Sequence, residues 1–321
     1  MRRRPLLTAA LASIAGPLRA QSAPWPSRPV TILVPYVAGG PSDTLARALA
    51  APMTAAIGQP VVVENRPGAN GAVAAQLAAR ATPDGHTLFV GASGLMTINP
   101  FVMARLPYDP VRDFAPLTVA IAAPNLLVAH PSFEPKTVPE LIAWLKAHPN
   151  QASYGTSGIG SSEHLTMELF AQATGTQLTH VPYAGSAAAV TDLLAGTTQL
   201  SFLNIASVAP QVQAGGLRAV AVGSLQPHPL FPTLPTVART LPGFEGGSWH
   251  SLVAPAATPE PLLERIHAVL VNCLRQPEVE ARLTRIGFSV VGSSRAEMAA
   301  RISAELTRWQ GVVRAAGIVP S

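Results

Sequence analysis

The chain has 321 residues, which exceeds the usual span of one hydrophobic core, so two lobes are expected. Its composition, 48% hydrophobic and 12% charged, is that of a globular protein and excludes a disordered one. The formal net charge of +5 suggests nucleic acid, but Arg2, Arg3, Arg4 and Arg19 lie in the N-terminal leader, and their removal leaves +1. No basic patch with interleaved aromatic residues remains, so nucleic acid is excluded as a partner.

The leader, residues 1–23, has the three parts of an export signal. Residues 2–4 form a charged region, residues 6–18 form a short apolar stretch, and Ala20 or Ala23 offers a small residue for cleavage. The apolar stretch is too short to span a bilayer. We therefore expect a cleaved signal and a mature protein that is exported by either the Sec or the twin-arginine route.

The segment from residue 25 to residue 123 alternates short apolar runs with amphipathic segments. Strands are expected at 30–34, 61–64 and 87–91, and helices at 42–57 and 72–80. This alternation predicts parallel strands that are covered by helices on both faces. Ligands of such sheets bind outside the carboxyl ends of the strands, which here are the loops 35–43, 65–71 and 91–99.

A second series of strands and helices follows two apolar runs, 114–122 and 125–129, that suit a crossing between lobes. Its strands are expected at 152–155 and 178–181 and its helices at 139–147, 163–174 and 187–195, and the segments 199–203, 207–214 and 218–222 complete the lobe. A strand at 249–254 and helices at 259–275, 277–286 and 294–316 are expected to return to the first lobe. The predicted division is 24–124 with 224–321 as lobe 1 and 125–223 as lobe 2, and two connections permit hinge closure.

The loop after the first strand has the features of an anion site. A Gly-Gly turn ends at Gly40, and Ser42 or Asp43 stands where a helix N-cap is expected. The first amides of a helix lack partners and carry partial positive charge, so this end favours an anion. The segment 181–186 repeats the pattern in the second lobe. The sequence therefore predicts two facing cradles for a small carboxylate.

Signals for catalysis are weak. The segment 155–160 lacks the third glycine and the acidic residue of a dinucleotide fingerprint, so no nicotinamide cofactor is expected. The histidines form no metal-binding pair of the His-x-x-x-His type, so no metal is expected. Ser157, Ser161 or Ser162 beside His164 leaves open a periplasmic serine hydrolase, although Gly-x-Ser-x-Gly is absent. Binding without catalysis and without a cofactor is the favoured interpretation.

Several motifs together resemble one family. They include WPSRPV at 25–30, VPYVAGGPSD at 34–43, ENRPGANG at 64–71, YGTSGIGSSEH at 154–164 and HVPYAGS at 180–186. In this order they resemble the substrate-binding receptors of tripartite tricarboxylate transporters, the Bug-type proteins, from residue 25 to the C-terminus. The resemblance implies an α/β, two-lobed periplasmic binding protein of type II (Venus flytrap), each lobe a mostly parallel sheet flanked by helices. It further implies a monomeric receptor, not an enzyme, that passes a small carboxylate to membrane permease subunits. A receptor of the same fold that feeds a membrane signalling protein remains an alternative.

The resemblance also implies a set of ligand-binding residues. These are Tyr36, Val37, Ala38, Gly39, Ser42, Asp43, Ser93, Thr97, Thr156, Ser157, Ser161, Ser162, His164, Tyr183, Ala184, Gly185, Ser186 and Asn204. Within the set, Asp43 is expected to cap its own helix and hold the loop, since a free carboxylate would repel the ligand. Many family members have Asp-Asn where this chain has Leu203-Asn204. We therefore expect a plain mono- or dicarboxylate rather than an amino acid, and the sequence does not say which.

Overall fold

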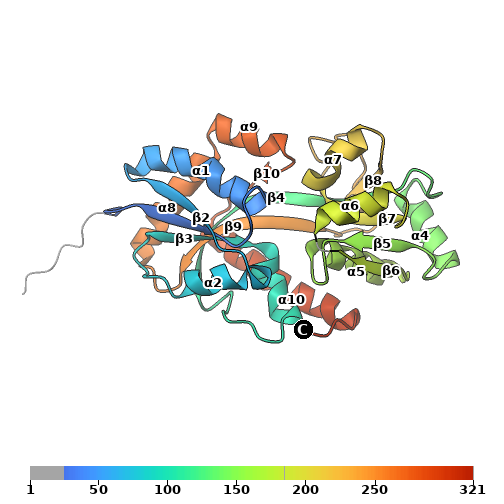
Figure 1. Cartoon of the computed structure of the whole chain (residues 1–321), viewed down its shortest axis with the longest axis horizontal. Helices are drawn as coiled ribbons and strands as arrows, with labels where there is room; N and C mark the ends of the chain where they lie inside the picture. Colours follow the sequence, from blue (N-terminus) through green and yellow to red (C-terminus); the bar gives the residue numbers. More distant parts are fainter. Residues whose placement is uncertain (1–24, 184, 321) are drawn as a thin grey trace, which may run out of the picture.

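The computed structural model describes residues 25–183 and 185–320, so the predicted export signal and Ala184 lie outside the described residues. Two lobes lie side by side, and the long strands β4 (Phe114–Ala129) and β9 (Gly247–Pro255) run from one into the other (Figure 1). This is the two-lobed α/β architecture that the sequence predicts. In the described part of the chain, no helix combines the length and apolar character needed to cross a membrane.

The sheet of the first lobe has helices on both faces. Strand β1 (Val30–Val34) pairs in parallel with β2 (Val61–Asn65) and β3 (Thr87–Ala92), and β3 pairs antiparallel with β9. Because side chains alternate along a strand, Ile32 packs in the cluster of α1 (Pro41–Ile57) and Leu33 in that of α2 (Ala72–Ala79). The predicted βα units of this lobe are confirmed.

The second lobe repeats the plan. Strand β5 (Ser153–Thr156) pairs in parallel with β6 (Thr179–Pro182) and β7 (Leu200–Asn204). The helices of this lobe are α4 (Val138–Ala147), α5 (Ser162–Thr174), α6 (Ser186–Leu194) and α7 (Ile205–Gln213), and β8 (Arg218–Val222) pairs with β4. Each of these elements begins and ends within two residues of its predicted position, because the apolar periodicity and the glycine-rich turns define it locally.

The crossing between the lobes differs from the prediction. The two expected apolar runs form one continuous strand, β4, which pairs antiparallel with β9 from Phe114 opposite Pro255 to Pro124 opposite Gly247. Beyond Pro124 the same strand pairs with β7 and β8 of the second lobe. Extended backbone therefore continues through the hinge, where the sequence suggested an interruption.

Glycines let the strands pass closely at the hinge. A Cβ on Gly247 would lie 2.6 Å from the carbonyl oxygen of Ala123 and 2.8 Å from Cα of Pro124. A Cβ on Gly223 would lie 2.4 Å from the oxygen of Gly246. Such distances to backbone atoms exclude any side chain at these two positions, so the crossing is built from backbone against backbone.

The chain between β8 and β9 contacts the second lobe before it returns. It contains η3 (Val237–Arg239), and Val237 and Phe244 lie in the same cluster as Phe202 of β7. The division into 24–124 with 224–321 and 125–223 therefore remains a proposal, with segment 224–246 packed partly on the second lobe.

The C-terminal helices are α8 (Glu260–Leu274), α9 (Pro277–Arg285) and α10 (Arg295–Ala315), and the short strand β10 (Ser289–Val290) pairs with β4. Helix α8 packs against α1 and β4. This helix begins one residue later than the predicted start at 259, because Pro259 is its N-cap.

Helix α10 contacts both lobes (Figure 1). Met298 and Ile302 pack on the first lobe, whereas Trp309 and Val313 share an apolar cluster with Leu165 of α5. Besides the covalent connections, the lobes are thus joined by packing under the hinge.

Candidate ligand-binding site

A cavity of about 310 Å³ lies between the lobes, at the carboxyl ends of β1, β3, β5 and β7. It is lined by Tyr36, Pro41, Asn70, Ala92, Ser93, Gly94, Ser157, Gly160, Ser161, Ser162, Glu163, Ser186, Asn204, Ser207, Ser248 and His250. Both lobes contribute, and Asn204 of the second lobe donates to the hydroxyl of Ser248 on β9 at 3.1 Å. This is the place at which α/β sheets bind ligands.

The structure brings part of the predicted set to this cavity. The predicted residues that line it are Tyr36, Ser93, Ser157, Ser161, Ser162, Ser186 and Asn204. The predicted residues that do not line it are Val37, Ala38, Gly39, Ser42, Asp43, Thr97, Thr156, His164, Tyr183 and Gly185. Ala184 lies outside the described residues.

Several of the others have structural partners instead. Thr97 donates to Glu305 of α10 at 3.2 Å, and Tyr183 donates to Asp192 of α6 at 2.6 Å. Val37 is exposed at the loop tip. The two hydrogen bonds attach Thr97 and Tyr183 to helices, and neither side chain lines the cavity.

Asp43 holds the first loop, although not as an N-cap. Helix α1 begins at Pro41 with Gly40 as N-cap, which corrects the prediction of Ser42 or Asp43. The Asp43 carboxylate accepts from the amide of Gly39 at 2.9 Å and from Arg47 Nε at 2.8 Å. Burial raises the pKa of Asp43, but the hydrogen bonds from Arg47, Gly39 and Asn65 bring it below its ordinary value. The chain's own carboxylate therefore uses a loop amide that was expected to bind the ligand.

Ser42 is paired with a residue of β9 that the sequence did not suggest. Its hydroxyl lies 3.0 Å from Nδ1 of His250, and both side chains are buried. Burial lowers the pKa of His250 to about 4, so the imidazole is neutral at neutral pH. His250 lines the cavity as a polar but uncharged group.

Two further histidines lie in the second lobe beneath the β5–α5 loop. The rings of His164 and His180 stack with centroids 3.9 Å apart, and Nδ1 of His164 accepts from the amide of Gly160 at 3.1 Å. Burial lowers the pKa of His180 to about 4, and burial together with His180 lowers that of His164 to about 3. Both rings are therefore neutral and hold the loop in place.

The serines of this loop do not form a hydrolase pair. Ser157 and Ser162 donate to the carboxylate of Glu163, at 2.8 and 3.3 Å. Ser161 is the N-cap of α5 and accepts from the backbone amide of His164 at 3.2 Å. The His164 ring is bonded to Gly160, and among the described residues no three His, Cys, Asp or Glu side chains are grouped to hold a metal.

Most of the cavity residues that the sequence missed lie in the predicted loops or within three positions of a predicted residue, and two come from long-range strand pairing. The missed residues are Pro41, Asn70, Ala92, Gly94, Gly160, Glu163, Ser207, Ser248 and His250. Strand β9 was predicted, but its antiparallel place beside β3, which brings Ser248 and His250 to the cavity, has no local signal. Glu163 was adjacent to the predicted His164, and only the helix phase distinguishes the two.

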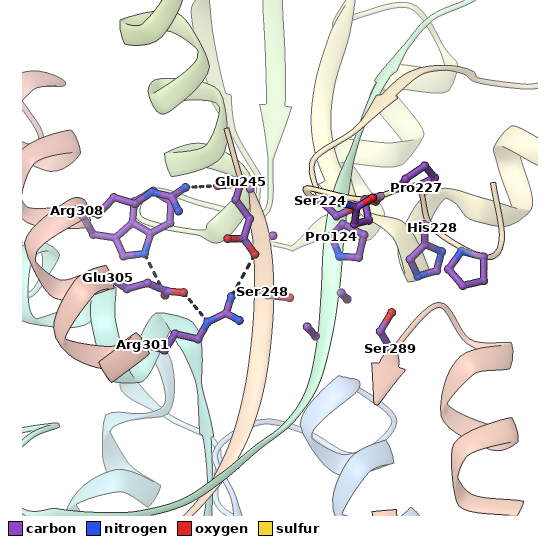
Figure 2. Close-up of a pocket in the computed structure, with 17 residues that line it drawn as sticks. Pro124, Ser224, Pro227, His228, Glu245, Ser248, Ser289, Arg301, Glu305 and Arg308 are labelled. Atoms are coloured by element: carbon purple, nitrogen blue, oxygen red, sulfur yellow. Dashed lines mark hydrogen bonds and ion pairs between the residues drawn. The ribbon is translucent and has the colours of Figure 1, made fainter. Parts of the chain in front are cut away.

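A second cavity, of about 240 Å³, lies beside the hinge and shares Ser248 with the first. Figure 2 shows Arg301 between Glu245 and Glu305, with Arg308 bonded to the carbonyl of Glu245. Arg301 Nε donates to Glu305 at 2.9 Å, and Trp249 donates to the same carboxylate at 2.8 Å. These charges balance within the protein, so we interpret the second cavity as part of the hinge.

Comparisons with known proteins agree with this geometry. A family profile described as "Tripartite tricarboxylate transporter family receptor" matches residues 45–318. Protein BugT of Bordetella pertussis is 33% identical over 310 residues, which cover 96% of this chain and 94% of BugT. A solved structure, R. palustris Rpa4515 with adipate, has a TM-score of 0.80 and 36% identity, covering 92% of this chain and 100% of that one. MatC from Rhodopseudomonas palustris, solved with bound malate, has a TM-score of 0.75 and 34% identity, covering 90% and 100%.

Proposed function

The chain belongs to the tripartite tricarboxylate transporter receptor family, Bug type, and from this membership we propose that it is an exported receptor for a small carboxylate. It binds the carboxylate in the cavity between its lobes and delivers it to the membrane subunits of a tripartite transporter. The mature protein is a periplasmic monomer that begins after residue 20 or 23 and acts without a cofactor.

One observation carries the proposal. The interlobe cavity is lined from both lobes by small hydroxyl and amide side chains at four strand ends. Its volume of about 310 Å³ is that of a site for a small molecule. Two similar proteins were solved with carboxylates, adipate and malate, which supports this ligand class here.

We propose Tyr36 and Ser93 as ligand donors on the first lobe. Ser93 Oγ accepts from the amide of Trp249 at 3.4 Å, so its own proton is available to a ligand oxygen. Burial raises the pKa of Tyr36 to about 12, so its hydroxyl also keeps a proton. On the second lobe, Ser157, Ser161, Ser162, Ser186 and Asn204 are the proposed contacts.

Catalysis is not part of the proposal. At the edge of the cavity, the Ser42 hydroxyl lies 3.0 Å from Nδ1 of His250, but Ser42 is only 1% exposed. A hydrolytic role would require an accessible hydroxyl whose proton passes to a histidine.

Ligand binding is tested by thermal shift of the mature protein with a panel of mono-, di-, aromatic and amino carboxylates. A ligand present at about a hundred times its dissociation constant adds about 2.7 kcal/mol of stability. Ser93→Ala should weaken binding by about tenfold, since a hydrogen bond to a charged group contributes about 1.5–3 kcal/mol. Ser303→Ala, at an exposed position, is the control. A panel without any shift, or equal affinities of both variants, would overturn the proposed site.

Delivery is tested separately. Uptake of the bound carboxylate by cells that carry the transporter's membrane subunits should depend on this receptor. Normal uptake without it, together with loss of a ligand-dependent signalling output, would favour the sensor alternative.

A further inference from the structure

We propose that Glu163 makes the second-lobe wall of the cavity a site for a ligand ammonium group, so that the receptor selects an amino-carboxylate over a dicarboxylate of the same length. This inference rests on the proposed function, because it assumes that a carboxylate ligand enters the interlobe cavity. It goes further by assigning opposite hydrogen-bonding roles to the two walls.

Glu163 is a buried acid that borders the cavity. It lies in the first turn of α5, is 5% exposed, and lines the cavity with the serines around it. Three hydroxyls from separate places contact its carboxylate: Ser157 at 2.8 Å, Ser162 at 3.3 Å and Ser186 of α6 at 3.3 Å. Glu163 therefore connects the β5–α5 loop to the start of α6.

These contacts fix the direction of the hydrogen bonds. An ionised carboxylate only accepts, so all three serine protons point to Glu163. The hydroxyl oxygens then offer lone pairs, and not protons, to anything else in the cavity. A carboxylate has about four acceptor positions, and the three serines use three of them. The wall that was expected to donate to a ligand carboxylate instead accepts from a ligand donor.

Charge leads to the same conclusion. Among the described residues that line the cavity, none is Lys or Arg, and Glu163 is the one acid. His250 on the opposite wall is neutral at neutral pH, since burial lowers its pKa to about 4. The positive end of α5 is already matched by Glu163 in its first turn. A second ligand carboxylate at this wall would meet an acid without a compensating cation, whereas an ammonium group would form a charge-assisted hydrogen bond.

The first-lobe wall has the complementary character. Ser93 has a free hydroxyl proton, because its oxygen accepts from the amide of Trp249. Tyr36 retains its phenolic proton and also lines the cavity. A ligand with a carboxylate at one end and an ammonium group at the other would therefore lie with its carboxylate toward Tyr36 and Ser93.

The geometry replaces the expectation that was based on Leu203. That expectation disfavoured an amino-acid ligand because leucine occupies a position where many relatives have an acid. Leu203 is fully buried in the core, and only its neighbour Asn204 lines the cavity. An acid nevertheless reaches the cavity from α5 instead of β7, so leucine at position 203 does not exclude an ammonium group.

The test compares ligands that differ only at one end. Calorimetric titrations of the mature protein would use 4-aminobutyrate against succinate and 6-aminohexanoate against adipate. In the pair that fits the cavity, the amino-carboxylate should bind about tenfold or more tightly than the dicarboxylate. Glu163→Gln keeps the shape and removes the charge, and should lower this ratio by about tenfold or more. Glu134→Gln removes an equal charge from an exposed position of the same lobe and should leave the ratio unchanged.

The outcomes separate the two proposals. A wild-type protein that binds no carboxylate of either kind would overturn the proposed function and this inference with it. Dicarboxylates that bind as tightly as their amino counterparts would overturn this inference alone. An unchanged ratio in a folded Glu163→Gln protein, with folding checked by circular dichroism, would also overturn it. If Glu163→Gln does not fold, the ratio of amino-carboxylate to dicarboxylate affinity in the wild-type protein decides whether the inference holds.

Discussion

The hydroxyl oxygen of Ser42 and Nδ1 of His250 lie 3.0 Å apart, although 208 positions separate the two residues. The contact joins the first turn of α1 to strand β9, which enters the first lobe from the hinge. The ring of His250 also meets Phe288 edge-on, with centroids 6.2 Å apart. The hydrogen bond and the ring contact thus fix the orientation of the His250 side chain, which borders the cavity.

Ser42→Ala should therefore lower both the stability of the protein and its affinity for the ligand. The substitution leaves Nδ1 of the buried His250 without its partner, which costs about 1–3 kcal/mol. Urea unfolding measures this loss, and calorimetry of a bound carboxylate should show a lower affinity because His250 lines the cavity. Ser303→Ala, at an exposed position of α10, should change neither quantity. A Ser42→Ala protein as stable as the wild type would mean that the contact contributes nothing.

The stacked pair His164 and His180 predicts how stability varies with pH. Their pKa values in the folded protein, about 3 and about 4, lie below the ordinary value of 6.5. Between these values the unfolded chain binds protons that the folded chain does not. Stability is therefore complete above about pH 6.5 and falls as the pH decreases, by up to about 1.4 kcal/mol per pH unit for each histidine.

Urea unfolding near pH 7.5 and near pH 5.5 measures this loss. Buried His250, whose pKa is also lowered to about 4, adds a loss of the same sign. His180→Gln removes one of these groups and should make the dependence on pH shallower in this interval. Asp43 does not interfere, because its lowered pKa confines its own contribution to more acidic solutions. Stability that is constant or increases toward pH 5.5 would contradict the assignment of neutral histidines.

The sequence predicted the local elements and the general location of the cavity. Val30–Val34 and α5 follow from strand and helix periodicity, and the cavity position follows from the rule that ligands bind at strand ends. The choice between Glu163 and His164 could not be predicted in this way. Successive helical residues point about 100° apart, so a one-residue difference decides which side chain faces the cavity. The motif favoured the histidine, and tertiary packing turned the glutamate toward the cavity.

A methyl group added at Gly247 in the hinge should destabilise the protein, whereas one added at an uncrowded glycine should not. In Gly247→Ala the new Cβ would lie 2.6 Å from the Ala123 oxygen, so β4 and β9 must separate. We expect a loss of about 1–3 kcal/mol, as for other overpacked sites, and a lower ligand affinity because Ser248 is adjacent. The control is Gly311→Ala in α10, where a Cβ meets nothing within 4 Å. That variant should instead gain about 0.5–1 kcal/mol, since alanine favours a helix. Equal stability changes in the two variants would show that the crossing is not tightly packed.

Trp309 of α10 predicts how firmly the lobes are held together. Its side chain is 3% exposed and shares a cluster with Leu165 of α5 and with Val102 of α3 (Asn99–Val102). A further contact joins the same elements, because Gln172 of α5 donates to the carbonyl of Val312 at 3.1 Å. Trp309→Ala should cost about 3–5 kcal/mol, as for other large buried aromatic residues.

The elements that lose protection from hydrogen exchange show whether Trp309 links the two lobes or stabilises only one of them. Hydrogen exchange of the Trp309→Ala protein should accelerate in both α5 and the end of α10, whereas β1 and β3 should remain protected. Gln310→Ala, at the next and exposed position, should leave both helices unchanged. Faster exchange confined to α10 would show that the helix does not hold the second lobe. Faster exchange in α5 would mean that any closure over a ligand must move the lobes against this packed cluster as well as about the hinge strands.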